Sequence, residues 1–213
     1  MTARGEDLGA VGEGNDDGLD ERIERVAGAL RAHNIEAIVV DTALEARRVV
    51  LELIPEGAEV HSGKSKTLED TGLYVEIVES GRYDALRPKV LAMDRATQGR
   101  EIRKLMAAPD VMLGSVAAVT EEGALVTASA TGSQLGPYVS GAGRVILVVG
   151  SQKIVPDLEA AFRRITDVAF PYENAQVRAR MGVDTKLEKV LVIYGEWQAG
   201  RTSVVLVREP VGA

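Results

Sequence analysis

Short apolar runs that alternate with helical patterns constrain the fold of this chain more than any other feature of its sequence. Runs rich in Val, Ile and Leu lie at residues 35–40 (IEAIVV), 110–114 (DVMLG) and 144–149 (RVILVV). Continuous apolar runs are typical of strands buried on both faces, and parallel strands need helical crossovers between them. The alternation therefore predicts an α/β fold, a mostly parallel sheet flanked by helices, with about six to eight strands and about six helices.

The remaining periodicity divides the chain into further elements. A helical pattern of apolar residues begins at Leu19 and stops near Asn34. The turn Glu121-Glu122-Gly123 lies between two short apolar runs and predicts a hairpin. Further strands are expected at 58–61, 117–120, 124–127, 189–194 and 203–207, and further helices at 44–54, 67–79, 94–107, 156–166 and 171–181.

Length and charge set the domain organisation and exclude one class of partner. Residues 1–18 contain five Gly, several acids and no apolar periodicity, which predicts a disordered acidic tail, and residues 19–213 fit a single domain. The net charge is −7, but residues 21–213 hold 24 basic and 26 acidic side chains, and the whole chain has eight aromatic residues. Without a basic excess or many aromatic rings for stacking, no nucleic acid is expected as a partner.

The chain contains no cysteine, which removes several kinds of site at once. Disulfides, thiolate nucleophiles, and Cys-ligated zinc or iron–sulfur clusters are excluded for this chain, and its two histidines, His33 and His61, predict no metal site. No apolar run approaches the ~20 residues that a membrane span needs, and the acidic, Gly-rich start does not resemble a signal peptide. We therefore expect a cytoplasmic protein without a membrane span.

Loops that follow predicted strands carry the candidate binding site, because ligands of open α/β sheets bind beyond the carboxyl ends of the strands. The loop at residues 61–67 (HSGKSKT) combines hydroxyls, a Gly and two Lys at a predicted helix start. It lacks the spacing of a P-loop but suits an anionic ligand, and a helix cap with solvated lysines is the alternative interpretation. The candidate ligand-binding residues of this and the other loops are Ser62, Gly63, Lys64, Ser65, Thr67, Thr120, Thr131, Gly132, Ser133, Gln134, Gly150, Gln152 and Lys153.

Three of these loops are expected to meet in a shared pocket for a small anionic ligand, since they lie beside strand ends and are rich in small or hydroxyl residues. They are the loops 62–67, 131–134 and 150–153. Glu121 and Glu122 are candidate catalytic carboxylates, although acidic residues beside a Gly are also ordinary turn chemistry. Trp197 is expected to pack in the core or at a sheet edge.

Three motifs in the second half of the chain are similar to those of a known family. They are the run 120–126 (TEEGALV), the pair Thr131-Gly132 and the run 148–160 (VVGSQKIVPDLEA). From about Glu21 to Gly212, the chain resembles the LUD-domain (lactate-utilisation, LutC-like) family. The resemblance implies a fold like that of the phosphosugar isomerase and CoA-transferase superfamily.

The resemblance also implies a role in organic-acid metabolism. Proteins of this family are associated with oxidation of L-lactate to pyruvate beside iron–sulfur subunits. This implies that the chain is an accessory or small-anion-binding subunit, that it binds no cofactor itself, and that iron–sulfur redox partners hold the clusters. Ser133-Gln134 stands where many members have Asn-Arg, so the resemblance supplies no anion-binding Arg there.

Two other functions remain open on the sequence. One is a self-sufficient enzyme of the isomerase or transferase type that acts on a phosphorylated or CoA-linked small molecule. In that enzyme, Glu121 or Glu122 would be the base or nucleophile, and Lys64 and Lys153 would hold the anion. The other is a regulatory sensor that uses the same pocket without turnover.

Overall fold

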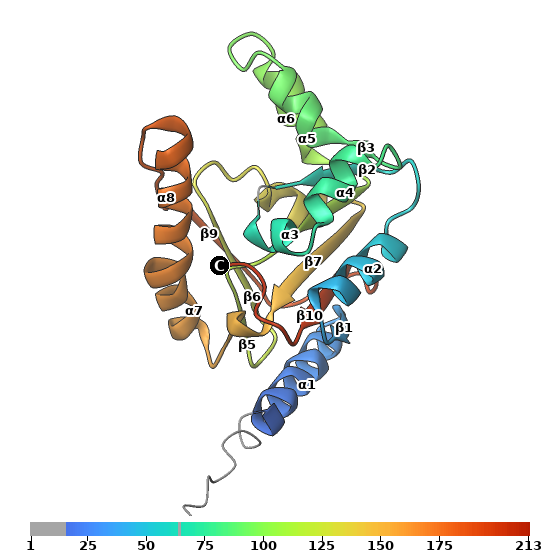
Figure 1. The fold of residues 1–213 in the computed structure, drawn as a ribbon, viewed down its shortest axis with the longest axis vertical. Helices are drawn as coiled ribbons and strands as arrows, with labels where there is room; N and C mark the ends of the chain where they lie inside the picture. Colours follow the sequence, from blue (N-terminus) through green and yellow to red (C-terminus); the bar gives the residue numbers. More distant parts are fainter. Residues whose placement is uncertain (1–15, 64) are drawn as a thin grey trace, which may run out of the picture.

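The computed structural model describes residues 16–63 and 65–213, and its centre is a six-stranded sheet (Figure 1). The strand order is β1-β10-β7-β4-β2-β3, and every pairing in it is parallel. The strands are β1 (Glu36–Val40), β2 (Glu59–Ser62), β3 (Asp84–Ala85), β4 (Val111–Gly114), β7 (Arg144–Gly150) and β10 (Thr202–Val207). The predicted α/β fold with a mostly parallel sheet is confirmed.

A smaller sheet lies beside it, with the strand order β8-β5-β6-β9. Its strands are β5 (Ala118–Thr120), β6 (Leu125–Ser129), β8 (Ile154–Val155) and β9 (Lys189–Ile193). β5 and β6 pair antiparallel, which confirms the predicted hairpin. Gly123 completes the turn with a φ of 86°, a conformation that favours glycine, and Thr120 Oγ1 accepts a hydrogen bond from the Ala124 amide.

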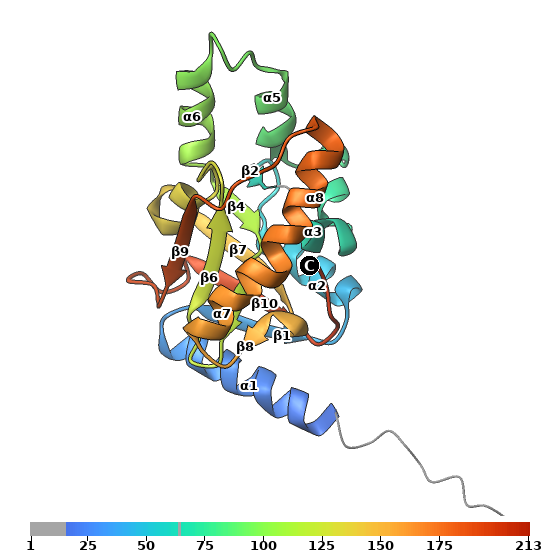
Figure 2. The same cartoon turned by 90° about the vertical axis from the view of Figure 1, so that its left-hand side faces the viewer.

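Both faces of the six-stranded sheet are covered, as Figures 1 and 2 show. One face packs against helices α2, α3 and α4 through buried residues such as Val50 and Leu68. The other face packs against α1 and the smaller sheet through residues such as Val26 and Val119. The helices are α1 (Asp16–Ala32), α2 (Ala43–Leu53), α3 (Lys66–Asp70), α4 (Leu73–Glu79), α5 (Leu86–Ala92), α6 (Gly99–Ala107), α7 (Leu158–Arg164) and α8 (Phe170–Met181).

This double cover explains the apolar runs of the sequence. Residues 145–150 of β7 are all buried, because β7 lies inside the sheet and has apolar layers on both sides. α7 and the turn that follows it pack on the outer side of the smaller sheet, where Ala161 and Ile165 form one apolar cluster with Ala118 and Val126. α5 and α6 project from the body as an arm (Figure 2).

Some predicted boundaries differ from the structure. α1 begins at Asp16, within the predicted tail, and residues 1–15 of that tail lie outside the described residues. The helix expected at 94–107 begins only at Gly99, because the Asp94 side chain accepts hydrogen bonds from the Ala96 amide and the Thr97 hydroxyl and so holds a turn. Within the described residues, no helix combines the length and apolar character that a membrane span requires.

Candidate functional site

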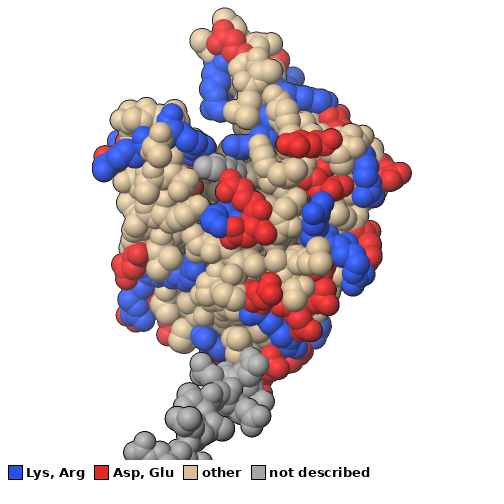
Figure 3. All heavy atoms as spheres, viewed as in Figure 1, with Lys and Arg blue, Asp and Glu red and all other residues tan. Residues whose placement is uncertain are grey.

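A cavity of about 960 Å³ lies beyond the carboxyl ends of β2 and β4, and α3, α6 and α8 contribute to its walls. His61 of β2 and Gly114 of β4 line it, as do Thr67 of α3 and Phe170 of α8. Figure 3 shows its mouth as a notch between the tip of α8 and the arm of α5 and α6, with Lys and Arg side chains on both sides. We call it the Lys153 cavity, after the buried lysine in its wall.

Lys153 ends the short 3-10 turn Ser151–Lys153 that follows β7, and only 4% of its surface is exposed. Its Nζ donates hydrogen bonds to Thr67 Oγ1 at 2.7 Å and to Ser115 Oγ at 3.0 Å. The two hydroxyls are also bonded to each other, with Thr67 Oγ1 donating to Ser115 Oγ at 3.2 Å. The partners that the structure gives this buried amine are therefore hydroxyls from two other segments of the chain.

The charges around Lys153 leave its ammonium poorly compensated. Burial lowers the pKa of Lys153 to about 7, the Arg164 charge lowers it as well, and Asp70 acts in the opposite direction. Asp70 is already engaged, because its carboxylate is paired with the Lys66 ammonium and its Oδ2 accepts from the Gly212 amide at 3.0 Å. A buried amine without a carboxylate partner of its own stands near the balance between its neutral and charged forms at neutral pH.

The last residues of the chain pack beside this amine. Gly212 has a φ of 89°, and a Cβ on it would lie 2.1 Å from Thr67 Oγ1 and 2.8 Å from Lys153 Nζ. Gln152 holds the segment, since its Nε2 donates to the Val211 carbonyl at 2.9 Å and to the Gly212 carbonyl at 3.2 Å. Gly212 is therefore required both by its backbone conformation and by its close approach to the amine.

The charged lining of the cavity is strongly cationic. Arg87 of α5, Arg103 of α6 and Arg95 between them have no ion-pair partner within the part of the chain that the structure describes. The charged residues in the described lining are seven Lys or Arg and one Glu: Lys66, Arg87, Arg95, Arg103, Lys153, Arg180, Lys186 and Glu173. Glu173 lies 3.6 Å from Arg180, and Lys66 is paired with Asp70 outside the lining, so the positive excess rests on the remaining cations. This excess of positive charge favours an anion inside the cavity.

Two buried polar side chains complete the lining. His61 is 4% exposed, and burial lowers its pKa, so its imidazole is neutral at pH 7. Its Nδ1 lies 3.3 Å from the Met106 carbonyl, which can only accept, so Nδ1 carries the proton and Nε2 is free to accept. The Tyr138 hydroxyl donates to the Ser115 carbonyl at 3.2 Å, and burial raises the pKa of Tyr138.

The loop after β6 forms another part of the wall. Gly132 has a φ of 83°, and its amide donates to Ser129 Oγ at 2.9 Å. Gln134 Oε1 accepts from the same Ser129 hydroxyl at 3.2 Å, so the loop is braced by its own polar side chains. Its residues in the lining are Ala130, Thr131, Gly132, Ser133 and Gln134. The structure thus brings this loop, Thr67 and Lys153 to one cavity.

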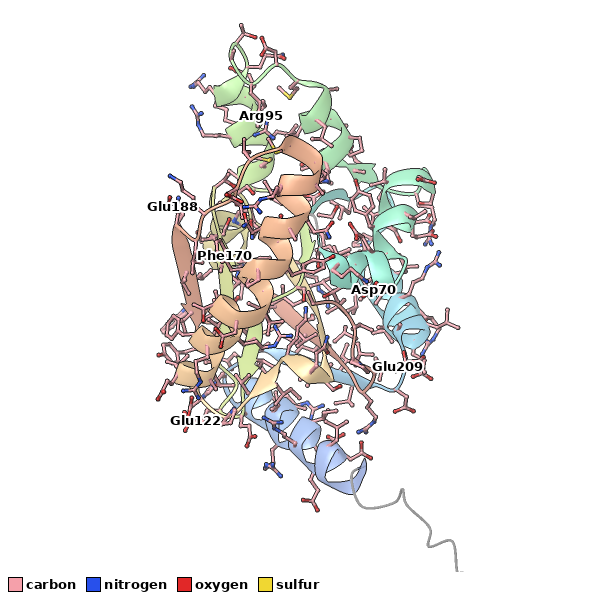
Figure 4. The ribbon with its side chains drawn as sticks, turned by 60° about the vertical axis from the view of Figure 1, so that its left-hand side comes forward. Asp70, Arg95, Glu122, Phe170, Glu188 and Glu209 are labelled. Carbon is pink, nitrogen blue, oxygen red and sulfur yellow. The ribbon has the colours of Figure 1, made fainter. Side chains whose placement is uncertain are left out.

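The predicted catalytic carboxylates lie elsewhere. Glu121 Oε1 accepts from Arg22 Nε at 2.6 Å, and neither Glu121 nor Glu122 lines the Lys153 cavity. Figure 4 places Glu122 near the opposite end of the molecule from Arg95, with Phe170 between them; Arg95 and Phe170 both line the cavity. The turn that carries the two glutamates joins β5 to β6 at the opposite end of β6 from the cavity loop, so the role expected for them beside the lysines lacks the required geometry.

The other predicted binding residues divide into two groups. Gly63 and Ser65 line the cavity, and Lys64 lies outside the described residues. The rest lie outside the described lining: Ser62, Thr120, Gly150 and Gln152. Gly150 serves the packing of the last residues instead, because a Cβ there would lie 2.5 Å from the Val211 amide nitrogen.

Sequence reasoning missed the residues that complete the site. Ser115 and Gly212 come next to Lys153 only through the fold, and no local pattern marks them. Arg87, Arg95 and Arg103 carried a usable signal, since they recur at spacings of eight residues in a segment with few acids.

Comparison with known proteins gives one family. The family model of the LUD domain matches residues 23–186, which is more than half of the chain. A crystal structure of a DUF162 family protein from Deinococcus radiodurans superimposes with a TM-score of 0.49 at 12% sequence identity, over 89% of this chain and 97% of that chain. No curated protein matches the sequence. The expected likeness to the phosphosugar isomerase and CoA-transferase superfamily stays a prediction.

Proposed function

The chain belongs to the LUD domain family, which is associated with lactate utilisation, and from this premise we propose that it binds a small organic anion in the Lys153 cavity. In this proposal the chain is an accessory, ligand-binding subunit of organic-acid metabolism. It serves oxidation of L-lactate to pyruvate or a closely related reaction.

The observation that carries the proposal is the charge of the cavity within an acidic chain. The chain has a net charge of −7, yet the described lining holds seven Lys or Arg residues, among them Lys153 with its lowered pKa, and one acid. Cations that line a concave, water-poor surface raise the local concentration of an anion and strengthen its binding. The volume of about 960 Å³ exceeds what lactate alone would fill, so a longer anion, such as a phosphate ester or a CoA derivative, also fits the cavity.

The redox chemistry of such a system would lie on other chains. Oxidation of a 2-hydroxy acid to a 2-oxo acid removes two electrons and two protons, which an acceptor must take. This chain has no cysteine with which to ligate an iron–sulfur cluster. In the proposed arrangement, iron–sulfur partner subunits accept the electrons and this chain holds the organic anion.

The test is a binding measurement with a matched pair of arginine variants. Purified chain is titrated calorimetrically with L-lactate, pyruvate, inorganic phosphate and CoA. We expect at least one of these anions to bind, and Arg103→Ala to weaken that binding about tenfold, because it removes one charge-assisted contact. Arg100→Ala removes the same charge from the same helix, outside the described cavity lining, and should leave the affinity unchanged.

Two results would contradict the proposal. The first is that none of the four anions binds to the wild type. The second is that Arg100→Ala and Arg103→Ala weaken binding equally, which would mean that the charge of α6 acts only at long range.

A further inference from the structure

The buried amine of Lys153 points to a more specific ligand than an anion alone. We propose that Lys153 forms a reversible imine with the carbonyl carbon of the bound anion, so that the ligand is a small carbonyl compound with a carboxylate or phosphate group. This inference rests on the anion binding proposed above. It adds a covalent step at an atom that the binding proposal uses only as a charge.

The first argument is that Lys153 does not have the surroundings of a structural cation. A buried ammonium normally has a carboxylate partner, because hydroxyls alone do not offset the loss of hydration. The partners that the structure gives Lys153 are the hydroxyls of Thr67 and Ser115, and the nearby Asp70 carboxylate is held by Lys66 and by the Gly212 amide. An apolar side chain at position 153 would pack between the same segments without the free-energy cost of burying a charge.

The second argument is that the surroundings favour the neutral, nucleophilic form. Arg164 of α7 acts on Lys153 as a like charge, His61 in the cavity wall is neutral, and Asp70 of α3 acts in the opposite direction with its charge shared by Lys66. Burial is the main cause that lowers the pKa of Lys153 to about 7, and the Arg164 charge lowers it as well, so a large fraction of the amine carries a free lone pair at pH 7 to 8. Desolvation in this manner is a recognised way to activate a lysine towards carbonyl carbons.

The third argument is the presence of proton carriers in contact with the amine. The Thr67 and Ser115 hydroxyls lie 2.7 and 3.0 Å from Nζ and are bonded to each other at 3.2 Å. A hydroxyl both donates and accepts, so this pair can take a proton from nitrogen and return one to oxygen. The required groups for addition and dehydration are therefore within one hydrogen-bonded cluster.

The step balances without an oxidant or reductant. The Nζ lone pair attacks the carbonyl carbon, the electrons of the C=O π bond move to oxygen, and one proton passes from nitrogen to that oxygen to give a carbinolamine. The carbinolamine then loses its hydroxyl together with a second nitrogen proton as water, and the C=N bond forms. The positive charge of the cavity lining would favour the anionic group of the same molecule.

The test is reductive trapping on the wild-type chain. Protein is incubated at pH 7.5 with cyanoborohydride and either pyruvate, a 2-oxo acid, or dihydroxyacetone phosphate, a ketose phosphate, and the modified lysines are mapped by peptide mass spectrometry. L-Lactate, which has no carbonyl group, should form no adduct and, where it binds, should protect Lys153. Calorimetric titrations with all three compounds run in parallel.

We expect one of the two carbonyl compounds to label Lys153 about tenfold or more above Lys104, an exposed lysine of α6, because burial activates Lys153 and Lys104 is not buried. Lys153→Arg keeps the charge, cannot form an imine and should lose this label. The wild-type map decides the question even if that variant fails to fold.

Equal labelling of Lys153 and Lys104, or binding of a carbonyl compound when neither of the two compounds labels Lys153, would overturn the imine and leave the proposed anion binding intact. Absence of binding by every anion would overturn both.

Discussion

Two cations that are largely removed from solvent have opposite surroundings in this protein. Arg201 has a side chain that is 10% exposed, is paired with Glu196 at 2.6 Å and donates to the carbonyls of Pro137 and Tyr138 at 2.8 and 3.0 Å. Lys153 is buried to a similar degree but is bonded to hydroxyls. The charge of Arg201 is neutralised by a carboxylate within the fold. The charge of Lys153 is not neutralised by any of the hydroxyls that it contacts.

The difference indicates different roles. Arg201 joins the start of β10 to the turn at residues 137–141, and one carboxylate and three backbone carbonyls accept from it, as expected of a structural group. Lys153 lines a cavity whose other charges are mostly positive, so an arriving anion can supply what the fold does not. The predictions below test this contrast, from the largest expected effect to the smallest.

The largest effect is expected at Arg201. Arg201→Met leaves the Glu196 carboxylate without its cation, with the Thr202 hydroxyl as its remaining partner, and should lower the free energy of unfolding by about 3–5 kcal/mol. Arg48→Met is the matched control, since Arg48 pairs with Glu52 on the exposed face of α2 and should contribute less than about 1 kcal/mol. Urea denaturation measures both values, and equal losses would contradict the structural role of Arg201.

The second effect is a pH dependence at Lys153. The amine has a pKa of about 7 in the folded chain, against an ordinary value of about 10.4 when unfolded. Between these values the unfolded state binds more protons, so the folded state gains stability as pH rises. The penalty for burying the charge is present in full below pH 7 and is lost as pH rises towards 10.4.

Lys153→Met removes this dependence. At pH 7 the variant should be at least as stable as the wild type, and from pH 7 to pH 10 the wild type should gain on the order of 3 kcal/mol relative to it. Urea denaturation of both proteins at several pH values gives the difference. If the difference in the free energy of unfolding between the wild type and Lys153→Met does not change with pH, then Lys153 is not a buried amine with a lowered pKa.

The smallest effect concerns the hydroxyls. Thr67→Val removes one hydrogen-bond partner of Lys153 and should cost about 1–2 kcal/mol while lowering the pKa of the lysine further. Thr71→Val is the matched control, since Thr71 is also buried in this region but donates to the Thr67 and Leu68 carbonyls. If Thr71→Val shifts the pKa of Lys153 as much as Thr67→Val does, then the hydrogen bond between Lys153 and Thr67 does not determine that pKa.

The sequence was sufficient for the sheet and for part of the site. The run 144–149 is apolar on both faces, and this is a local property that any buried parallel strand must have. Lys153 follows this run after a short loop, so the sequence also predicts that it lies at a strand end. The loops 62–67, 131–134 and 150–153 are predicted to meet from their composition and their position beside strands, and both properties can be seen in the sequence.

The partners of these residues could not be predicted in the same way. Arg22 and Glu121 are 99 residues apart, and only packing of α1 against the hairpin brings them together. Lys66 and Lys153 are the same residue type in similar loops, yet one pairs with Asp70 at the surface and the other is buried. The prediction that Trp197 packs in the core or at a sheet edge is wrong: the side chain is fully exposed, because Trp197 lies in the loop between β9 and β10 and not in a strand of either sheet.

The most direct measurement is the titration of Lys153 itself by NMR, with the Cε and Nζ resonances assigned by comparison with Lys153→Met. The surroundings of the amine predict a midpoint near pH 7 in the free chain, and an upward shift when an anion fills the cavity, because the opposite charge favours the ammonium. A midpoint near the ordinary lysine value of about 10.4, unchanged by anions, would contradict the contrast with Arg201 and the role of the cavity that is built on it.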